Sequence, residues 1–178
     1  MDRIWKLSLM IVGLILADQF SKGVIQSSFT VGESVPVLDG FFSITYVRNP
    51  GAAFGFLGTA HESIRRPILI GLPIVAGIWL MALIWKGRKG HILPVLAYSL
   101  IFAGAIGNLI DRIALNYVVD FLDFYLGDNH FPAFNIADSA ISVGGALVGV
   151  DAIREWRESK AQENEGDAQA DAPPSEPS

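Results

Sequence analysis

Four long apolar segments dominate this sequence and restrict the folds that it can adopt. They cover residues 4–25, 67–85, 92–112 and 134–156, and each is close to the length of about 20 residues that a helix needs to cross a bilayer. Of the 178 residues, 51% are hydrophobic and 17% are charged, whereas soluble domains average about 25% charged residues. The sequence therefore predicts an all-α membrane protein with four transmembrane helices.

The first apolar segment shares one feature with a secretory signal peptide, because Arg3 and Lys6 precede its apolar run. No small-x-small cleavage site follows, since the run ends in Ala17-Asp18-Gln19. Three more apolar segments also follow it. We interpret residues 4–25 as a retained span rather than a cleaved leader.

The basic residues predict the orientation of the four spans. Lysines and arginines in short flanks mark the cytoplasmic side of a membrane protein, and eight of them would lie on one side here: Arg3, Lys6, Lys86, Arg88, Lys89, Arg154, Arg157 and Lys160. Trp5, Trp85 and Trp156 lie at the same ends, where indole rings favour the interface. Both termini are therefore predicted to be cytoplasmic.

Two further segments lie outside the predicted spans. Residues 36–56 combine an aromatic and β-branched run with an Asn49-Pro50-Gly51 turn, which predicts a small β element on the outer side. Residues 159–178 are polar and acidic and carry most of the net charge of −5, so we expect a disordered cytoplasmic tail after one membrane domain, residues 1–158. The rest of the chain has no basic excess, which argues against nucleic-acid binding.

Ionisable residues within the spans are the strongest indication of function, because a charge in hydrocarbon is costly. Asp18, Asp111, Arg112 and Asp138 lie in the apolar segments or at their outer edges. Asp120 lies in the outer loop before the fourth span. All five lie toward the outer side, so they can converge near one depth.

The start of the fourth span places Asn135 and Asp138 on one helix face, because they are three residues apart. Ser142, Gly145 and Gly149 continue that face, which predicts close helix packing and an Asp138 side chain inside the bundle. The alternative is an ordinary polar helix start, with Asn135 as N-cap and Asp138 favoured by the helix dipole. An N-cap at Asn135 needs no additional carboxylate in the first turn. We therefore prefer the interpretation in which Asp138 has a chemical function.

In the third span, Asn108 and Arg112 share a face that Ser99, Ala103 and Gly107 extend as a packing stripe. Asp111 is interpreted as the ion-pair partner of Arg112, because a carboxylate beside an arginine stays ionised and cannot donate a proton. Asn108 and Arg112 are better suited to positioning a substrate or the backbone.

A pair of carboxylates is the chemistry that this pattern favours. Two carboxylates at short range share one proton, so that one activates a water and the other protonates a leaving group. Asp138 is one candidate, and Asp120 is the preferred partner. Asp123 has similar apolar neighbours, so the residues alone leave the choice between Asp120 and Asp123 open.

Other chemistries find less support. Cysteine is absent and the three histidines are scattered, and His61-Glu62 lacks the second histidine of a zinc helix because Arg65 stands there. Ser21 and Lys22 are neighbours and cannot face each other on a helix. No phosphate-binding loop is present. We therefore expect neither a metal nor a cofactor.

Four blocks, in this order, resemble the lipoprotein signal peptidase (signal peptidase II) family. They span about residues 15–145 and are Ala17-Asp18-Gln19-Phe20-Ser21-Lys22, Arg48-Asn49-Pro50-Gly51-Ala52-Ala53-Phe54-Gly55, Gly107-Asn108-Leu109-Ile110-Asp111-Arg112 with Val118-Val119-Asp120-Phe121, and Phe134-Asn135-Ile136-Ala137-Asp138-Ser139. One block alone would be weak evidence. Four blocks in order across four spans are specific.

The resemblance implies an intramembrane aspartic endopeptidase of the bacterial inner membrane, acting near the periplasmic face. It implies a four-helix bundle with an outer β-cradle, and a catalytic pair formed by Asp120 and Asp138. It implies cleavage of a prolipoprotein N-terminal to its diacylglyceryl-modified cysteine. Membrane lipid is the other expected partner, and a monomer is expected. The supporting residues that carry over are Asp18, Lys22, Asn49, Gly51, Asn108, Arg112 and Asn135.

Two other classes of protein remain as alternatives. A small proton-coupled transporter would also use buried carboxylates, but it should place polar groups through the full depth of its spans. Here the inner halves are apolar apart from Ser8 and Ser99. A structural assembly factor would need no paired acids. The sequence also leaves open whether the loop of residues 58–66 closes over the site.

Overall fold

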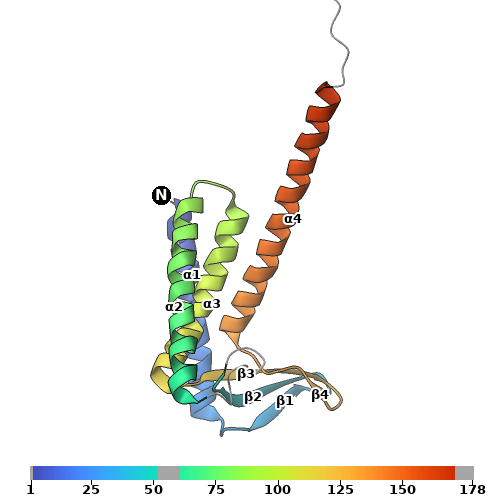
Figure 1. Cartoon of the computed structure of the whole chain (residues 1–178). Coiled ribbons are helices and arrows are strands. Elements are labelled where there is room, and N and C mark those ends of the chain that lie inside the picture. Colours follow the sequence, from blue (N-terminus) through green and yellow to red (C-terminus); the bar gives the residue numbers. More distant parts are fainter. Residues whose placement is uncertain (1, 52–60, 171–178) are drawn as a thin grey trace, which may run out of the picture.

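The computed structural model describes residues 2–51 and 61–170 and contains helices and one small sheet (Figure 1). The helices are α1 (Asp2–Ser28), α2 (Glu62–Gly87), α3 (Ile92–Leu115) and α4 (Ile136–Ala170). The strands are β1 (Ser34–Leu38), β2 (Phe42–Asn49), β3 (Val118–Leu126) and β4 (Asn129–His130). All four helices are long and apolar enough to cross a membrane, so the predicted helical membrane fold with a small β element is confirmed.

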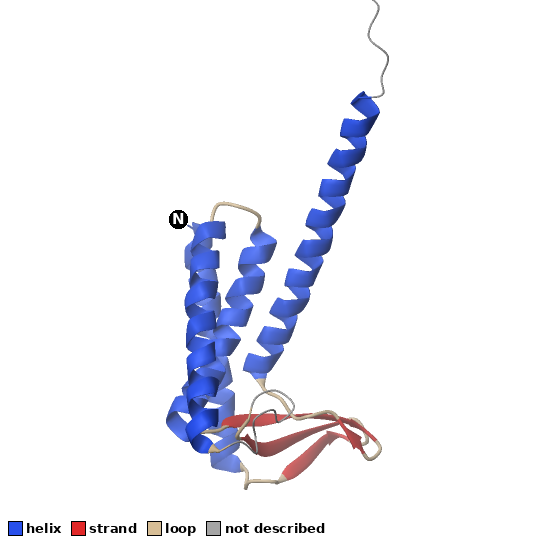
Figure 2. Ribbon diagram, viewed as in Figure 1, coloured by secondary structure: helices blue, strands red, loops and turns tan. Residues whose placement is uncertain are grey.

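The sheet lies at one end of the helices, as Figures 1 and 2 show. The N-terminal end of α1, the turn between α2 and α3, and the far end of α4 all lie at the opposite end. Helix α3 is the central helix, because 44% of its most apolar window is buried against 17% to 22% in the other three. Its predicted packing stripe is confirmed, since Ser99, Ala103 and Gly107 are buried.

Helices α3 and α4 approach closely through small residues. A Cβ atom at Gly144 would lie 2.6 Å from Ile101 Cγ1 and 2.8 Å from the Ala97 carbonyl oxygen. The prediction that Ser142, Gly145 and Gly149 form the packing face is wrong, because all three are exposed. The buried face of α4 instead runs through Ala137, Ala140 and Gly144, one or two positions N-terminal to the predicted series. A helix advances about 100° per residue, so this shift decides which side chains face α3.

Gly144→Ala should destabilise the protein by about 1–3 kcal/mol, because the new methyl group overlaps backbone and side chain of α3. Gly145→Ala is the matched control, since a Cβ atom there meets no atom within 4 Å. Thermal unfolding in detergent checks the difference. A Gly144→Ala protein as stable as Gly145→Ala would contradict the close α3–α4 contact.

The sheet is antiparallel with the strand order β1-β2-β3-β4. Strand β3 pairs with β2 such that Asp120 lies opposite Val47 and Val118 lies opposite Asn49. The prediction that Asp120 lies in an outer loop is wrong, because Asp120 is part of β3. The β-branched and aromatic residues of Val118–Leu126 form a strand, but the two aspartates obscured its apolar pattern.

Parts of two predicted segments lie outside the described part of the chain. They are residues 52–56 of the predicted outer β element and residues 58–60 of the loop predicted at residues 58–66.

Helix α4 is longer than the predicted span. It runs to Ala170 and so continues through residues 159–170, which the sequence assigns to the acidic tail, whereas residues 171–178 lie outside the described part of the chain. Arg154 Nε lies 3.5 Å from Glu158 Oε1 one turn later. Alanine, glutamate, glutamine and lysine are strong helix formers, so a polar composition did not prevent the helix from continuing.

Candidate active site

Asp120 and Asp138 line one cavity of about 1050 Å³ at the sheet end of the helices. Asp120 lies near the start of β3, and Asp138 lies in the first turn of α4. Strand β3 is held against β2, while the chain between β3 and α4 forms an isolated bridge between Phe134 and Leu122. The sheet and the helix start therefore bring together two acids that are distant in sequence.

Asp120 is 2% exposed, and two asparagines hold its carboxylate. Asn49 Nδ2 donates to Oδ2 at 3.0 Å, and Asn135 Nδ2 donates to Oδ1 at 2.7 Å. Burial, and next the charge of Asp138, raise the pKa of Asp120 to about 7, although the two amide hydrogen bonds and Lys22 act in the opposite direction. At neutral pH a large share of Asp120 therefore carries a proton.

Asp138 makes hydrogen bonds with two asparagines, one through its carboxylate and one through its backbone. Asn108 Nδ2 donates to Asp138 Oδ1 at 2.7 Å, and the Asp138 backbone N–H donates to Asn135 Oδ1 at 2.9 Å. Asn135 is thus a helix cap, as the alternative interpretation held, and it also contacts Asp120. Its Nδ2 lies 3.2 Å from Asn108 Oδ1. The two asparagines join both acids into one hydrogen-bonded network.

Lys22 is a buried cation beneath this network, with 2% of its surface exposed. Its Nζ lies 2.8 Å from Asp18, 2.9 Å from Asp111 and 3.0 Å from Asn108 Oδ1. The predicted Asp111–Arg112 ion pair is wrong, because the nearest cation to Asp111 is Lys22 of another helix. Sequence neighbours on a helix point in different directions.

Asp18 and Asp111 each hold the backbone amide of the residue that precedes one of the two acids. Asp18 Oδ1 accepts from the Ala137 N–H at 2.9 Å, and Asp111 Oδ2 accepts from the Val119 N–H at 3.1 Å. These amides immediately precede Asp138 and Asp120. Gln19, which sequence reasoning missed as a functional residue, donates to Asp18 and Asp111 at 3.2 and 3.0 Å. Its position between Asp18 and Ser21 in a family block was the only signal for it.

The remaining predicted residues connect the end of β2 to α3. Asn49 Oδ1 accepts from the Gly51 N–H at 3.0 Å, which is a side-chain turn. Arg112 Nη2 donates to the Gly51 carbonyl oxygen at 3.3 Å, and its Nη1 donates to the Asn108 carbonyl oxygen at 3.4 Å. All nine predicted site residues therefore lie in one connected set of contacts.

Asp123 lies apart from this set. It contacts His130 Nδ1 at 2.9 and 3.0 Å, and it is not among the residues that line the cavity. Within residues 2–51 and 61–170, no group of three or more histidines or acids could hold a metal ion. The structure thus separates the two aspartates that the residues alone left equivalent.

Most of the residues that line the cavity are apolar. Leu72, Pro73 and Ala76 of α2 line one side, and Ile141, Ser142 and Val143 of α4 line the other. Phe131 and Phe134 close the sheet end. Fold and site together define a multi-pass membrane protein that holds two linked carboxylates in an apolar cavity, an arrangement suited to acid–base hydrolysis.

Comparison with known proteins then identifies the family. The family model described as "Signal peptidase (SPase) II", of the peptidase A8 group, matches residues 10–154. This chain therefore belongs to the signal peptidase II family of aspartic peptidases. The predicted family and enzyme class are confirmed.

Individual relatives agree with the family match. The chain is 46% identical over 153 residues to a lipoprotein signal peptidase of Syntrophus aciditrophicus, a match that covers 85% of this chain and 95% of the relative. It is 49% identical over 147 residues to that of Geobacter sulfurreducens, covering 83% and 91%. A solved bacterial membrane enzyme, determined by the in meso method at 2.3 Å, superposes with a TM-score of 0.78 at 34% identity, covering 85% of this chain and 90% of that one.

Proposed function

We propose that Asp120 and Asp138 are the catalytic pair with which this peptidase removes the signal peptide from prolipoproteins, by cleaving N-terminal to the diacylglyceryl-modified cysteine. The observation that carries the proposal is the network in which Asn108 and Asn135 connect both carboxylates at the wall of one apolar cavity. The family fixes the prolipoprotein as substrate class.

The two carboxylates have different roles in the reaction, because one is ionised and the other is protonated. The ionised carboxylate takes a proton from a water, which attacks the scissile carbonyl carbon. The protonated carboxyl group first supports the oxygen of that carbonyl and then supplies the proton that the leaving amine needs. The raised pKa of Asp120 favours one shared proton at neutral pH. Asn49, Asn108 and Asn135 hold the oxygens without adding charge.

The shape of the cavity suits a lipid-anchored peptide. The acyl chains of the modified cysteine would lie against the apolar walls of α2 and α4, with the scissile bond beside the acids. Residues Val47–Asn49 pair with β3 on one side, and no described strand pairs with them on the other. The extended substrate backbone would add to this free edge. Asn49 and Asp138 line the same cavity, which favours this placement.

We infer further that the chain acts as a monomer in the bacterial inner membrane, with both termini cytoplasmic and the sheet periplasmic. The support for this orientation is the position of basic residues at the end of the bundle opposite the sheet, at the start of α1 and in the turn between α2 and α3. Residues 1–158 would form the membrane domain, with the acidic segment beyond it in the cytoplasm.

The direct test incubates the purified protein with a diacylglyceryl-modified precursor and identifies the product by mass spectrometry. The expected product begins with the modified cysteine. The same precursor without its lipid is the control and should remain uncut. An intact lipidated precursor after full incubation would reject the proposed cleavage and favour the transporter alternative.

The raised pKa of Asp120 predicts the pH profile. Activity needs one proton on the pair, so kcat/KM should decrease about tenfold per pH unit above about pH 7, once Asp120 loses that proton. Asn49→Ala removes a hydrogen bond that lowers this pKa, so it should move the decrease to higher pH. A profile that stays flat to pH 9, or an Asn49→Ala profile that moves to lower pH, would contradict this assignment.

A further inference from the structure

Arg48 lies directly before Asn49, the residue that holds one oxygen of Asp120, and its own side chain contacts two tyrosines. Its guanidinium carbon lies 4.8 Å from the ring centroid of Tyr117 and 5.5 Å from that of Tyr46. Its Nε donates to the Tyr46 hydroxyl oxygen at 3.1 Å, and that oxygen lies 3.5 Å from the Tyr117 hydroxyl. These three side chains form an arginine–tyrosine cluster, in which a cation faces aromatic rings.

The two tyrosines of this cluster are held by different elements. Tyr46 is 3% exposed and packs in a core with Ile25 of α1 and Val119 of β3. Tyr117 follows Asn116, which ends α3 with a left-handed backbone conformation (φ 65°). The cluster therefore ties the end of β2 to the junction between α3 and β3.

The end of β2 needs such support, because it has a strand neighbour on one side alone. Strand β1 pairs with β2 only as far as Thr45, whereas β3 pairs with it as far as Asn49. Successive side chains of a strand alternate between its two faces. The Asn49 side chain accordingly contacts Asp120, and the Arg48 side chain contacts the tyrosines.

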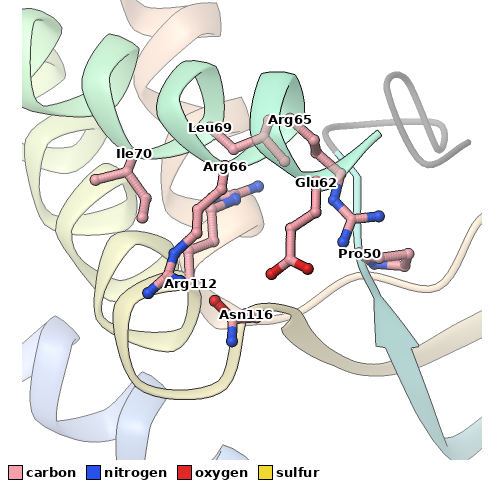
Figure 3. A pocket seen from close by; sticks show the side chains of 8 residues that line it. All are labelled: Pro50, Glu62, Arg65, Arg66, Leu69, Ile70, Arg112 and Asn116. Atoms are coloured by element: carbon pink, nitrogen blue, oxygen red, sulfur yellow. The ribbon is translucent and has the colours of Figure 1, made fainter. Parts of the chain in front are cut away.

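The turn after Asn49 is held separately. The Gly51 N–H donates to Asn49 Oδ1 at 3.0 Å, and Arg112 Nη2 donates to the Gly51 carbonyl oxygen at 3.3 Å. Figure 3 shows Pro50 of this turn and the Arg112 side chain in the last turn of α3. Arg112 thus acts on the chain after Asn49, and Arg48 acts on the chain before it.

Arg48 does not act on the proposed catalytic acids through its charge. The groups that interact with its charge are the two tyrosines. The charged groups that face Asp120 are Asp138 of α4, Lys22 of α1 and Arg112 of α3. Arg48 also lines the peptidase cavity. It can therefore affect the reaction through the asparagine that follows it or by contact with substrate.

We propose that Arg48 is a positioning residue, which anchors the end of β2 to the two tyrosines and thereby keeps Asn49 on Asp120. The guanidinium is already engaged by both rings and by a hydroxyl group, which favours this role over substrate contact. A small movement of the strand would lengthen the 3.0 Å hydrogen bond between Asn49 and Asp120. The inference rests on the proposed function, in which Asp120 is catalytic.

The test measures pH profiles of kcat and kcat/KM for cleavage of a lipidated precursor by the purified full chain. Arg48→Gln should lower kcat about three- to tenfold and change KM by less than about twofold. The Asn49 hydrogen bond lowers the pKa of Asp120, so its loosening should move the alkaline decrease to higher pH, by about half a unit. In an Asn49→Ala background, Arg48→Gln should cause no further movement.

Substitutions of Tyr117 supply the matched controls. Tyr117→Phe keeps the ring that faces the guanidinium and should behave like the wild type, whereas Tyr117→Leu should behave like Arg48→Gln. Arg157→Gln controls for the loss of a positive charge, because Arg157 is an exposed arginine in the distant half of α4. It should leave both profiles unchanged.

Three outcomes would overturn the role of Arg48. A higher KM with an unmoved pH profile would show substrate contact, and a loss of stability with unchanged kinetics would show a purely structural role. Further movement in the Asn49→Ala background would show that Arg48 acts independently of Asn49. If Arg48→Gln does not fold, Tyr117→Leu decides, since a wild-type profile in that variant would also reject the proposal. A wild-type protein that leaves the precursor uncut would instead reject the proposed function.

Discussion

Asp120→Asn and Asp138→Asn are each expected to lower kcat on the order of 10³-fold or more, and to leave the chain folded. Asparagine has nearly the shape of aspartate, and its one carbonyl oxygen can still accept from one surrounding amide, Asn49 or Asn135 at position 120 and Asn108 at position 138. It can neither take a proton from water nor give one to a leaving group. Single-turnover cleavage of a lipidated precursor measures the loss.

Asp123→Asn is the control for this prediction. Asp123 lies on the same strand as Asp120 but contacts His130 rather than the asparagine network. It should retain activity within about threefold of the wild type. Substantial activity in Asp138→Asn, or a loss in Asp123→Asn equal to that of Asp120→Asn, would contradict the assignment of the pair.

Lys22→Met is expected to destabilise the protein by about 3–5 kcal/mol, because it leaves the buried carboxylates of Asp18 and Asp111 without their cation. Methionine has a similar length, so the loss should come from charge rather than from a cavity. The same change removes the Lys22 hydrogen bond to Asn108 and should also lower activity. Thermal unfolding in detergent gives the stability, and the cleavage assay gives the activity.

Lys6→Met provides the comparison on the same helix, since Lys6 is exposed and should change stability by less than about 0.5 kcal/mol. A double-mutant cycle sharpens the result. Asp111→Asn should cost less in the Lys22→Met background than in the wild type, because the interaction has already been lost. Additive effects would show that Lys22 and Asp111 act independently.

The membrane fold was predictable because each span is a continuous apolar run, and this signal depends on composition alone. The identity of the second acid was not. Asp120 and Asp123 have similar sequence neighbours, and only the family resemblance selected Asp120. In the structure the two are separated by their surroundings: Asp120 lines the cavity, whereas Asp123 contacts His130.

Contacts between elements were not predictable from local sequence patterns. Arg112 is next to Asp111 in the chain, yet Lys22 of α1 binds Asp111, and no local pattern reveals a partner from another helix. The packing face of α4 was predicted one position away from Gly144, because several series of small residues fit a helical period. Strand β3 was missed because buried aspartates interrupt its apolar pattern.

The two walls of the peptidase cavity have a mechanical consequence. Helices α2 and α4 each pack extensively on α3, whereas no comparably extensive α2–α4 interface exists in the described residues. The distance between these walls can therefore change by tilting α2 about α3, without separating the contacts of Asp18, Lys22 and Asp111, because none of these contacts involves α2. Such a hinge would admit precursors that differ in fatty-acid length and branching, while the scissile bond meets the same fixed geometry each time.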